Sequence, residues 1–563
     1  MRLRFFLTKK TVLLILGSLT LSFILFGNSL RGTYTLDDNP VINDREVLES
    51  LEKLPEIFTS TWHPKQPWTG TYRPLTLVSF ALNNFIFSKD NTFGFHLVNI
   101  FLHALNVFLI FKVVSQFSSK RIAYLSALLF MFMPIHSESV SSIVGRKELL
   151  GLFFVLLSLL WFFKKKYFVS SSAFFLALLA NEFSISLLLL MGILLLIQTE
   201  SFLRSIKPSL YYITPLPIYF LLRYITLKQY AFGGGFIDPV INPLIFVSIK
   251  ERIFTALSHL YLYIQKTFYP LNLSPDYSFN QIPTVQNIFH SYQALLGLLF
   301  LIGFILLFIF SKKELKIALT LFLAPYVVMS NLFFITTGAF AERWWYLPSF
   351  GLAVLVAFGF DKIINNYKTL RPYLYSLGII ILIWYSLLTI EQNRVWLNNR
   401  NLFIYAAEAS PNSVGARSNL AAVYLEEERF AEAREEVEYA LSVYDKHPPA
   451  LNILGKLNWK DIRYKDAEVA FKKALEFDKN GRNHRSLFRS LAFLSLDLGK
   501  NTEAFMYMEE ALKWPPSRDS QKIVQIDEIL YEKIKKYSTR RSGSYTKEEI
   551  EELASLIKIV RGL

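Results

Sequence analysis

The chain has 563 residues, of which 52% are apolar and 16% aromatic, and its mean hydropathy is +0.32. This is more apolar material than a soluble fold buries, so the composition indicates membrane-spanning helices, while the absence of cysteine excludes disulfides, thiol catalysis and thiolate metal sites. The net charge is +15, and its excess lies before Ile390, where 32 Lys and Arg accompany 18 Asp and Glu, a distribution that fits loops beside anionic lipid better than nucleic-acid binding.

The first apolar run, from Thr11 to Gly27, follows a basic stretch as in a signal peptide, but no A-x-A-like cleavage site follows it. We therefore expect an uncleaved first helix. A bilayer core requires about 20 apolar residues per helix. Eleven runs fit this expectation: 11–27, 93–114, 122–135, 149–163, 168–180, 183–197, 210–227, 295–310, 315–334, 346–360 and 373–390. The sequence predicts an all-α, polytopic membrane domain over residues 1–392.

Basic clusters predict the orientation, because Lys and Arg accumulate in cytoplasmic loops. The clusters are Arg2/Arg4/Lys9/Lys10, Lys120/Arg121, Lys164/Lys165/Lys166, Arg204/Lys207, Lys312/Lys313/Lys316 and Lys362/Lys368/Arg371. All of them lie inside if the segment 253–269, which carries Ser258, His259 and Lys266, is a surface or re-entrant helix that does not cross. The first loop, 28–92, and the C-terminal tail then lie outside the cytoplasm.

Ionisable residues gather at the outer ends of the predicted spans. They are Asp37, Asp38, Arg73, His96, His136, Glu138, Arg146, Glu182, Arg223, Glu342 and Arg343. Charged groups near membrane depth are costly and usually mark function, so this set predicts one polar cavity on the outer face. The alternative is that each residue is an interfacial anchor or part of a paired helix end.

The tail, 393–563, contains a 34-residue repeat. Leu420, Ala421, Tyr424, Phe430, Ala433, Val437 and Ala440 recur as Leu454, Gly455, Tyr464, Ala467, Phe471 and Ala474, and then with a shift as Leu491, Ala492, Gly499, Ala504, Met508 and Ala511. The spacing is typical of the tetratricopeptide repeat (TPR) and predicts about three repeats over 411–516, with a helical cap near 548–561. Such a solenoid binds an extended peptide or a partner. The alternative is a stability cap for the membrane domain.

The acidic pair Asp37 and Asp38 follows the first span directly. A carboxylate at the membrane edge can act as a general base that takes a proton from an attacking hydroxyl. Its neighbour can orient it, contact sugar hydroxyls or bind a divalent ion, the one cofactor that the sequence suggests. The same segment, Asp-Asp-Asn-Pro, is also ordinary turn chemistry.

Six sequence blocks carry a resemblance to a known family. LDDNPVI from Leu36, TYRPLTLVSFALN from Thr71, FGFHLVN from Phe93, PIHSESVSSIVGRKELL from Pro134, NLSPDYS from Asn272 and AERWWYLPS from Ala341 follow one another as in the TMTC family. The chain resembles these transmembrane, TPR-containing O-mannosyltransferases of the glycosyltransferase-C superfamily over nearly its whole length. The short tail, and Ile135-His136 after Pro134 where the family has a histidine before the proline, depart from the animal proteins and suggest a bacterial inner-membrane relative.

The resemblance implies inverting transfer of a sugar, mannose favoured, from a polyprenyl-phosphate carrier to a Ser or Thr hydroxyl of a protein on the outer face. It makes Asp37 or Asp38 the base. The residues expected to bind the donor phosphate or the substrate are Arg343, Arg146, Arg73, Arg223, His136, Glu138, His96 and Glu342. Arginine suits this task because its planar fork matches phosphate oxygens and stays charged.

Several other functions remain open on the sequence. A related transferase could modify a glycolipid or cell-wall polymer, and a surface-polysaccharide polymerase or ligase can also carry TPRs, although it would leave the six blocks unexplained. From another class, the chain could be a non-catalytic membrane scaffold that recruits partners through its TPRs. The expected partners are the lipid-linked donor, a protein acceptor and membrane lipids, and no nucleic acid.

Overall fold

The computed structural model describes residues 9–43, 45–64, 67–233, 235, 237–333, 335–514 and 521–538. The chain divides into two compact units, one formed by residues 1–278 and 282–409 and the other by residues 279–281 and 410–563. The first unit thus extends to Ala409, beyond residue 392, where the sequence suggests the boundary. All regular elements in the described part of the chain are helical, which confirms the predicted all-α class.

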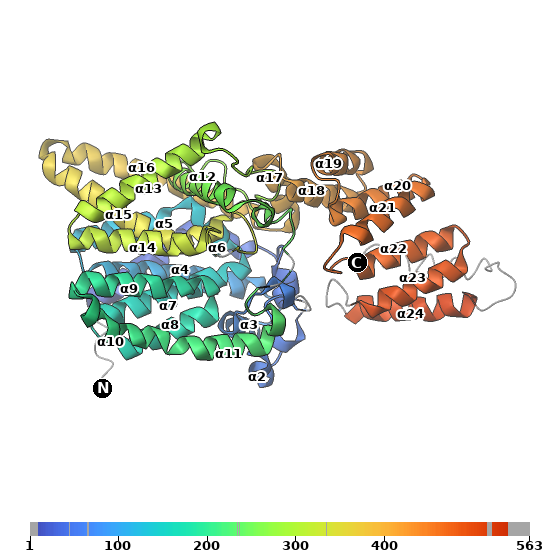
Figure 1. Ribbon diagram of the computed structural model, residues 1–563, viewed down its shortest axis with the longest axis horizontal. Helices are drawn as coiled ribbons and strands as arrows, with labels where there is room; N and C mark the ends of the chain where they lie inside the picture. The colour runs from blue at the N-terminus through green and yellow to red at the C-terminus, as the bar shows by residue number, and fades with distance from the viewer. Residues whose placement is uncertain are drawn as a thin grey trace. The chain divides into compact units, whose positions relative to one another are not determined.

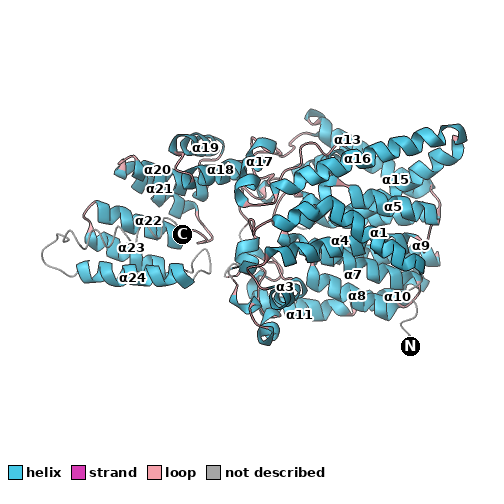
Figure 2. Ribbon diagram, turned by 180° about the vertical axis from the view of Figure 1, so that it is seen from behind, coloured by secondary structure: helices cyan, strands magenta, loops and turns pink. Residues whose placement is uncertain are grey.

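The first unit is a bundle of long helices that lie side by side, with short helices in the connecting loops (Figures 1 and 2). Its α-helices are α1 (Lys9–Phe26), α2 (Leu54–Ile57), α3 (Pro74–Phe87), α4 (Thr92–Val114), α5 (Lys120–Phe132), α6 (Ser137–Ser141), α7 (Arg146–Phe163), α8 (Tyr167–Ala180), α9 (Ser186–Thr199), α10 (Phe202–Ile213), α11 (Pro215–Leu227), α12 (Ile249–Phe268), α13 (Tyr292–Phe310), α14 (Lys313–Met329), α15 (Tyr346–Asn366), α16 (Arg371–Val395) and α17 (Asn399–Ala409).

Six helical stretches in the described residues are long and apolar enough to cross a membrane. They are Lys9–Arg31, Thr92–Val114, Glu182–Thr199, Tyr292–Phe310, Glu342–Asn366 and Lys368–Val395. The other predicted spans also form helices, but these are shorter or more charged, so the count of eleven stays a prediction. The helix α12 is not among the six, and the sequence predicts that it does not cross.

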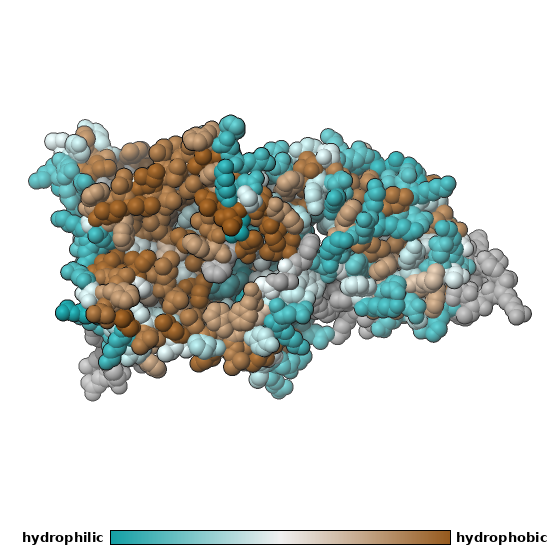
Figure 3. Space-filling model, in the orientation of Figure 1, coloured by the Kyte–Doolittle hydropathy of each residue, from teal (hydrophilic) through white to brown (hydrophobic). Residues whose placement is uncertain are grey.

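Apolar side chains cover the outside of the bundle. In Figure 3 hydrophobic surface extends along the long helices of the first unit, and hydrophilic residues gather at the helix ends. The helices α13 and α16 expose large side chains such as Phe300, Leu299, Ile380 and Leu387. This apolar belt is suited to contact with lipid. Helices can cross lipid because their backbone groups hydrogen-bond within each helix and leave only apolar side chains facing the hydrocarbon.

The first loop, which leads from α1 to α3, has a small core of its own. Val41, Ile42 and Trp62 of the loop pack with Phe80 of α3 and Phe95 of α4. The loop is also tied to the end of α16, since the backbone N–H of Thr33 donates to the carbonyl of Leu397 at 2.8 Å. This packing gives a long loop a fixed shape beside the helix ends.

The second unit consists of stacked helix pairs and confirms the predicted TPR solenoid. The pairs are α18 (Val414–Glu426) with α19 (Phe430–Val443), α20 (Pro448–Lys460) with α21 (Tyr464–Phe477), and α22 (His484–Asp497) with α23 (Asn501–Lys513), and α24 (Gln521–Ser538) packs on α23. Gly455 of α20 lies against the ring of Phe471, where a Cβ would come within 2.5 Å, so the small/large alternation of the repeat is a packing requirement. The predicted cap, 548–561, lies outside the described residues.

Candidate functional site

Asp38 attaches the first loop to the segment that precedes α7. Its carboxylate accepts hydrogen bonds from the backbone N–H of Thr35 (2.9 Å), the hydroxyl of Thr35 (3.2 Å) and the backbone N–H of Val144 (2.8 Å). The side chain is fully buried, and this burial raises the pKa of Asp38 to about 7. Its geometry is that of a residue that fixes the loop.

Asp37 lies in different surroundings. It is half-buried, and its charge interacts with the guanidinium of Arg343 and the ammonium of Lys147. The backbone turns sharply just before it, with a φ of 44° at Leu36. The turn therefore presents one carboxylate of the pair to backbone amides and the other to cations.

Arg343 is held by Glu138. Arg343 lies in the short helix Glu342–Trp345 before α15, and Glu138 lies in α6. The backbone N–H of Arg343 donates to one oxygen of Glu138 at 2.8 Å, and its guanidinium pairs with the other oxygen. The Glu138 side chain is 4% exposed and that of Arg343 is 33% exposed. The buried Glu138 carboxylate thus holds one part of the guanidinium, while another part stays accessible to solvent.

A second arginine, Arg73, forms a two-point pair with Glu182. Its Nε and Nη2 atoms donate to the two carboxylate oxygens at 2.7 and 2.6 Å. The guanidinium also lies 4.8 Å from the centre of the Trp62 ring. Arg73 precedes α3 and Glu182 precedes α9, so this pair joins the first loop to the helix bundle.

Lys147 and Glu148 at the start of α7 complete the set. The Lys147 ammonium lies 3.4 Å from a Glu148 oxygen and 5.8 Å from the centre of the Trp62 ring. Both side chains are about 5% exposed, and in the described part of the chain the Glu148 oxygens accept no hydrogen bond. Glu148 also interacts electrostatically with Arg73, Arg343 and Glu138.

These residues form what we call the charged cluster. Its members are Asp37, Arg73, Glu138, Lys147, Glu148, Glu182 and Arg343. They come from the first loop, α6, α7 and the segments before α9 and α15, which meet at one end of the bundle. The arrangement offers a half-buried carboxylate beside cations that carboxylates hold in place.

Arg146 lies outside the charged cluster. Its guanidinium is fully buried, 4.7 Å from the centre of the Phe80 ring. It donates to the side-chain oxygens of Asn83 and Asn99, both at 2.9 Å, and to the carbonyl of Phe95 at 2.8 Å. These bonds join α7 to α3 and α4, a role that differs from the expected contact with a lipid phosphate.

Three other predicted residues also make their contacts with residues outside the charged cluster. His136 is buried, with Nε2 2.8 Å from the Ser349 hydroxyl, and His96 is buried against Gly32, where a Cβ would come 2.9 Å from its Nε2. Arg223 donates to the carbonyls of Ala231 (2.7 Å) and Gly70 (2.6 Å). His136 and Arg223 thus join loops and helices through hydrogen bonds, whereas His96 packs against the first loop at Gly32.

Glu342, next to Arg343 in the sequence, points to a separate group of residues. It accepts a hydrogen bond from the backbone N–H of Ser274 at 2.8 Å and another from the Tyr277 hydroxyl. It also interacts electrostatically with Lys266. Ser274 and Tyr277 belong to the NLSPDYS block, so two blocks that are distant in the sequence meet here.

Lys147 and Glu148 are the members of the charged cluster that the sequence does not single out. They follow Arg146 directly in the sequence. Successive residues on a helix point about 100° apart, so the three side chains of 146–148 cannot all face one site. The partners of Arg146 lie in α3 and α4. Local spacing therefore gave no sign of which residue of the run faces the cluster.

The expected divalent ion stays a prediction. Across the described ranges, no group of three or more His, Asp or Glu side chains is arranged to hold a metal ion.

The chain is similar in sequence to protein O-mannosyl-transferases of animals. It is 27% identical to TMTC1 of Homo sapiens over 498 residues, which cover 77% of this chain and 56% of the relative. It is 26% identical to human TMTC3, with 82% and 54% covered, and 23% identical to Tmtc3 of Drosophila melanogaster, with 80% and 57% covered. No family model matches the chain. The chain spans a little over half the length of these relatives.

Among solved structures, one described as Pseudomonas aeruginosa pilF is 22% identical and covers 36% of this chain and 87% of its own, with a TM-score of 0.22. The TPR assignment therefore rests on the repeat and the helix pairs themselves. The similarity to the animal proteins, over about three quarters of the chain, supports the TMTC-like resemblance that the ordered sequence blocks carry.

Proposed function

We propose that the chain is a membrane glycosyltransferase that moves a sugar, mannose favoured, from a polyprenyl-phosphate carrier to a Ser or Thr hydroxyl of a protein. The observation that carries this proposal is the interaction of Asp37 with Arg343 and Lys147. The reaction needs a base and phosphate-binding cations close to the same point. The name that the relatives share, protein O-mannosyl-transferase, supports the choice of mannose and of a protein acceptor.

In the proposed reaction, Asp37 takes the proton of the acceptor hydroxyl while the hydroxyl oxygen bonds to the anomeric carbon of the sugar. The bond from that carbon to the phosphate oxygen breaks on the opposite face, and its electron pair leaves with the phosphate. The sugar configuration inverts, and no sugar–enzyme bond forms. The proton on Asp37 then passes to solvent or to the released phosphate.

The released polyprenyl phosphate carries one more negative charge than it had in the donor. We assign the stabilisation of this charge to Arg343, whose guanidinium is partly exposed, with Lys147 and Arg73 behind it. Glu138 and Glu182 orient the two arginines. We assign Asp38, Arg146, His96, His136 and Arg223 to the frame that keeps loop and helices in register.

We further propose that the charged cluster and the TPR unit face the extracytoplasmic side. A site there has no access to cytoplasmic nucleotide sugars, so a lipid-linked donor is the consistent substrate. The TPR unit is suited to holding an extended acceptor peptide. A cytoplasmic tail, detected by its protection from protease in sealed vesicles of known orientation, would contradict this part of the proposal.

Transfer by purified protein tests the reaction. The full chain is supplied with polyprenyl-phosphate-linked mannose or glucose and a secreted acceptor protein, and the sugar on the acceptor is measured by mass spectrometry. We expect transfer by the wild type and a loss of about 100-fold or more for Asp37→Asn, the usual contribution of a general base. Asp90→Asn, the same change at an exposed site in the same loop, should retain full activity.

Other outcomes would identify the alternatives. Normal transfer by Asp37→Asn would rule out the base. Transfer to a glycolipid and not to protein would favour the glycolipid enzyme. Absence of transfer by the wild type with either donor, together with capture of partners by the TPR unit, would favour the scaffold.

A further inference from the structure

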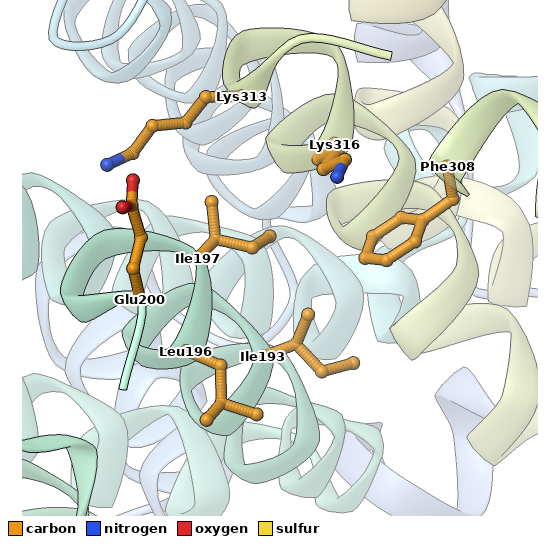
Figure 4. Close-up of a pocket in the computed structure, with 7 residues that line it drawn as sticks. All are labelled: Ile193, Leu196, Ile197, Glu200, Phe308, Lys313 and Lys316. Atoms are coloured by element: carbon orange, nitrogen blue, oxygen red, sulfur yellow. The ribbon is translucent and has the colours of Figure 1, made fainter. Parts of the chain in front are cut away.

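A second polar site lies at the other end of the helix bundle. A cavity of about 670 Å³ opens between the end of α9 and the turn from α13 to α14 (Figure 4). Its apolar wall consists of Ile193, Leu196, Ile197 and Phe308. A cavity of this volume lies in the range of small-molecule sites, and its apolar wall is suited to a hydrocarbon chain.

This cavity is separated from the charged cluster by the length of a span. The stretch Glu182–Thr199 has 18 residues, and at 1.5 Å per residue it is about 27 Å long. Glu182 at its start belongs to the charged cluster, and Glu200 just past its end lines the cavity. The hydrocarbon core of a bilayer is about 30 Å thick, so the cavity lies at the opposite membrane surface.

Three charged groups stand at the mouth of the cavity: Lys313, Lys316 and Glu200. Figure 4 shows the Lys313 ammonium and the Glu200 carboxylate turned toward each other. Lys316 is half-buried, and its ammonium lies 5.8 Å from the centre of the Phe308 ring. The lining thus carries one net positive charge, directly beside the apolar wall.

We propose that this cavity binds an anionic glycerophospholipid, with the phosphate at Lys316 and Lys313 and one acyl chain along α9. The charge pattern supports this occupant, because a phosphodiester lipid such as phosphatidylglycerol carries one negative charge at the level where its hydrocarbon begins. Each lysine at the membrane surface increases the affinity for an anionic headgroup by about fivefold. Glu200 balances Lys313, so the proposed site takes a single headgroup charge.

The proposal can be tested without measuring glycosyl transfer. Delipidated full-length protein in detergent is titrated with phosphatidylglycerol or phosphatidylcholine of the same acyl composition, and bound lipid is counted by native mass spectrometry. We expect tighter binding of phosphatidylglycerol. Lys313→Gln/Lys316→Gln should weaken that binding about 25-fold, and Glu200→Gln should strengthen it.

Lys312→Gln is the matched control, because Lys312 is exposed beside Lys313 but does not line the cavity. It should change the affinity less than twofold. An equal loss in Lys312→Gln would show diffuse attraction to a basic surface and would overturn the site. Equal binding of the two lipids, or binding of polyprenyl phosphate in preference to phosphatidylglycerol, would overturn the proposed occupant.

Discussion

Glu138 binds Arg343 twice, once through the backbone N–H and once through the guanidinium. The carboxylate is buried and comes from α6, while Arg343 lies in the short helix that leads into α15, so the pair fixes the arginine relative to α6. A cation that is held in place before the substrate arrives needs no reorganisation when charge develops on a leaving group.

Replacement of Glu138 by Gln should therefore impair transfer. Gln keeps the size of the side chain but removes the charge that anchors the guanidinium. Hydrogen bonds to charged groups contribute about 1.5–3 kcal/mol, so we expect kcat/KM to fall by roughly 10- to 100-fold. Donor turnover by the purified protein measures this. Glu52→Gln, an exposed site in the first loop, is the control, and an unimpaired Glu138→Gln enzyme would argue against a role for the pair.

Arginine-to-lysine changes should distinguish the roles of Arg146 and Arg343. Arg343→Lys keeps the charge but loses the fork that matches phosphate oxygens, so the KM for the lipid donor should rise about tenfold while the unfolding temperature stays near that of the wild type. Arg146→Lys replaces the forked guanidinium by a single ammonium, which cannot reach the acceptors of Asn83, Asn99 and Phe95 together. Each buried acceptor left without a donor costs about 1–3 kcal/mol, so the unfolding temperature should fall.

Thermal unfolding in detergent and donor titrations measure both effects. A selective rise in KM for Arg146→Lys, with no loss of stability, would reverse the two assignments.

The periodic parts of the structure could be predicted from the sequence. The apolar runs became helices, and the 34-residue repeat became helix pairs in which Gly455 faces Phe471. Both signals arise because each turn of a helix, and each repeat unit, buries the same face. The spacing of apolar residues within a short stretch of sequence therefore predicts the element.

The site could be predicted only in part, because its geometry depends on contacts between distant segments. The sequence identified the outer face as polar but could not distinguish Asp37 from Asp38, since the partner that occupies Asp38 is the amide of Val144, more than one hundred residues away. For the same reason the sequence favoured Arg146, and not Lys147, as a phosphate-binding residue. The direction of a side chain at the start of α7 depends on which helices pack there.

Glycines in α15 provide a matched test of the helix packing. A Cβ at Gly351 would come within 2.2 Å of the Phe322 backbone nitrogen in α14, whereas nothing lies within 4 Å of a Cβ at Gly359. Gly351→Ala should force the two helices apart and cost about 1–3 kcal/mol of stability. Gly359→Ala should be neutral or slightly stabilising, because Ala favours helix. Equal unfolding temperatures for the two variants would contradict the close contact.

The buried carboxyl of Asp38 should make the stability of the folded protein depend on pH. Its folded pKa is about 7, raised by burial, against about 3.9 in an unfolded chain. Between these values the folded protein keeps a proton that the unfolded chain has released. The contribution of Asp38 to stability is therefore fully present below pH 4 and is lost as the pH rises through 7, by up to about 1.4 kcal/mol per pH unit.

Unfolding temperatures at pH 4.5, 6 and 7.5 measure this contribution. Asn cannot titrate, so Asp38→Asn should show a shallower decline with rising pH than the wild type does. It should also be less stable at pH 4.5, because the Asn side chain has only one acceptor oxygen and its NH2 group cannot accept the second of the two N–H groups of Thr35 and Val144. Asp90→Asn, the same change at an exposed site of the same loop, is the control and should follow the wild-type profile. Parallel profiles for the wild type and Asp38→Asn would mean that this carboxyl does not titrate in the window.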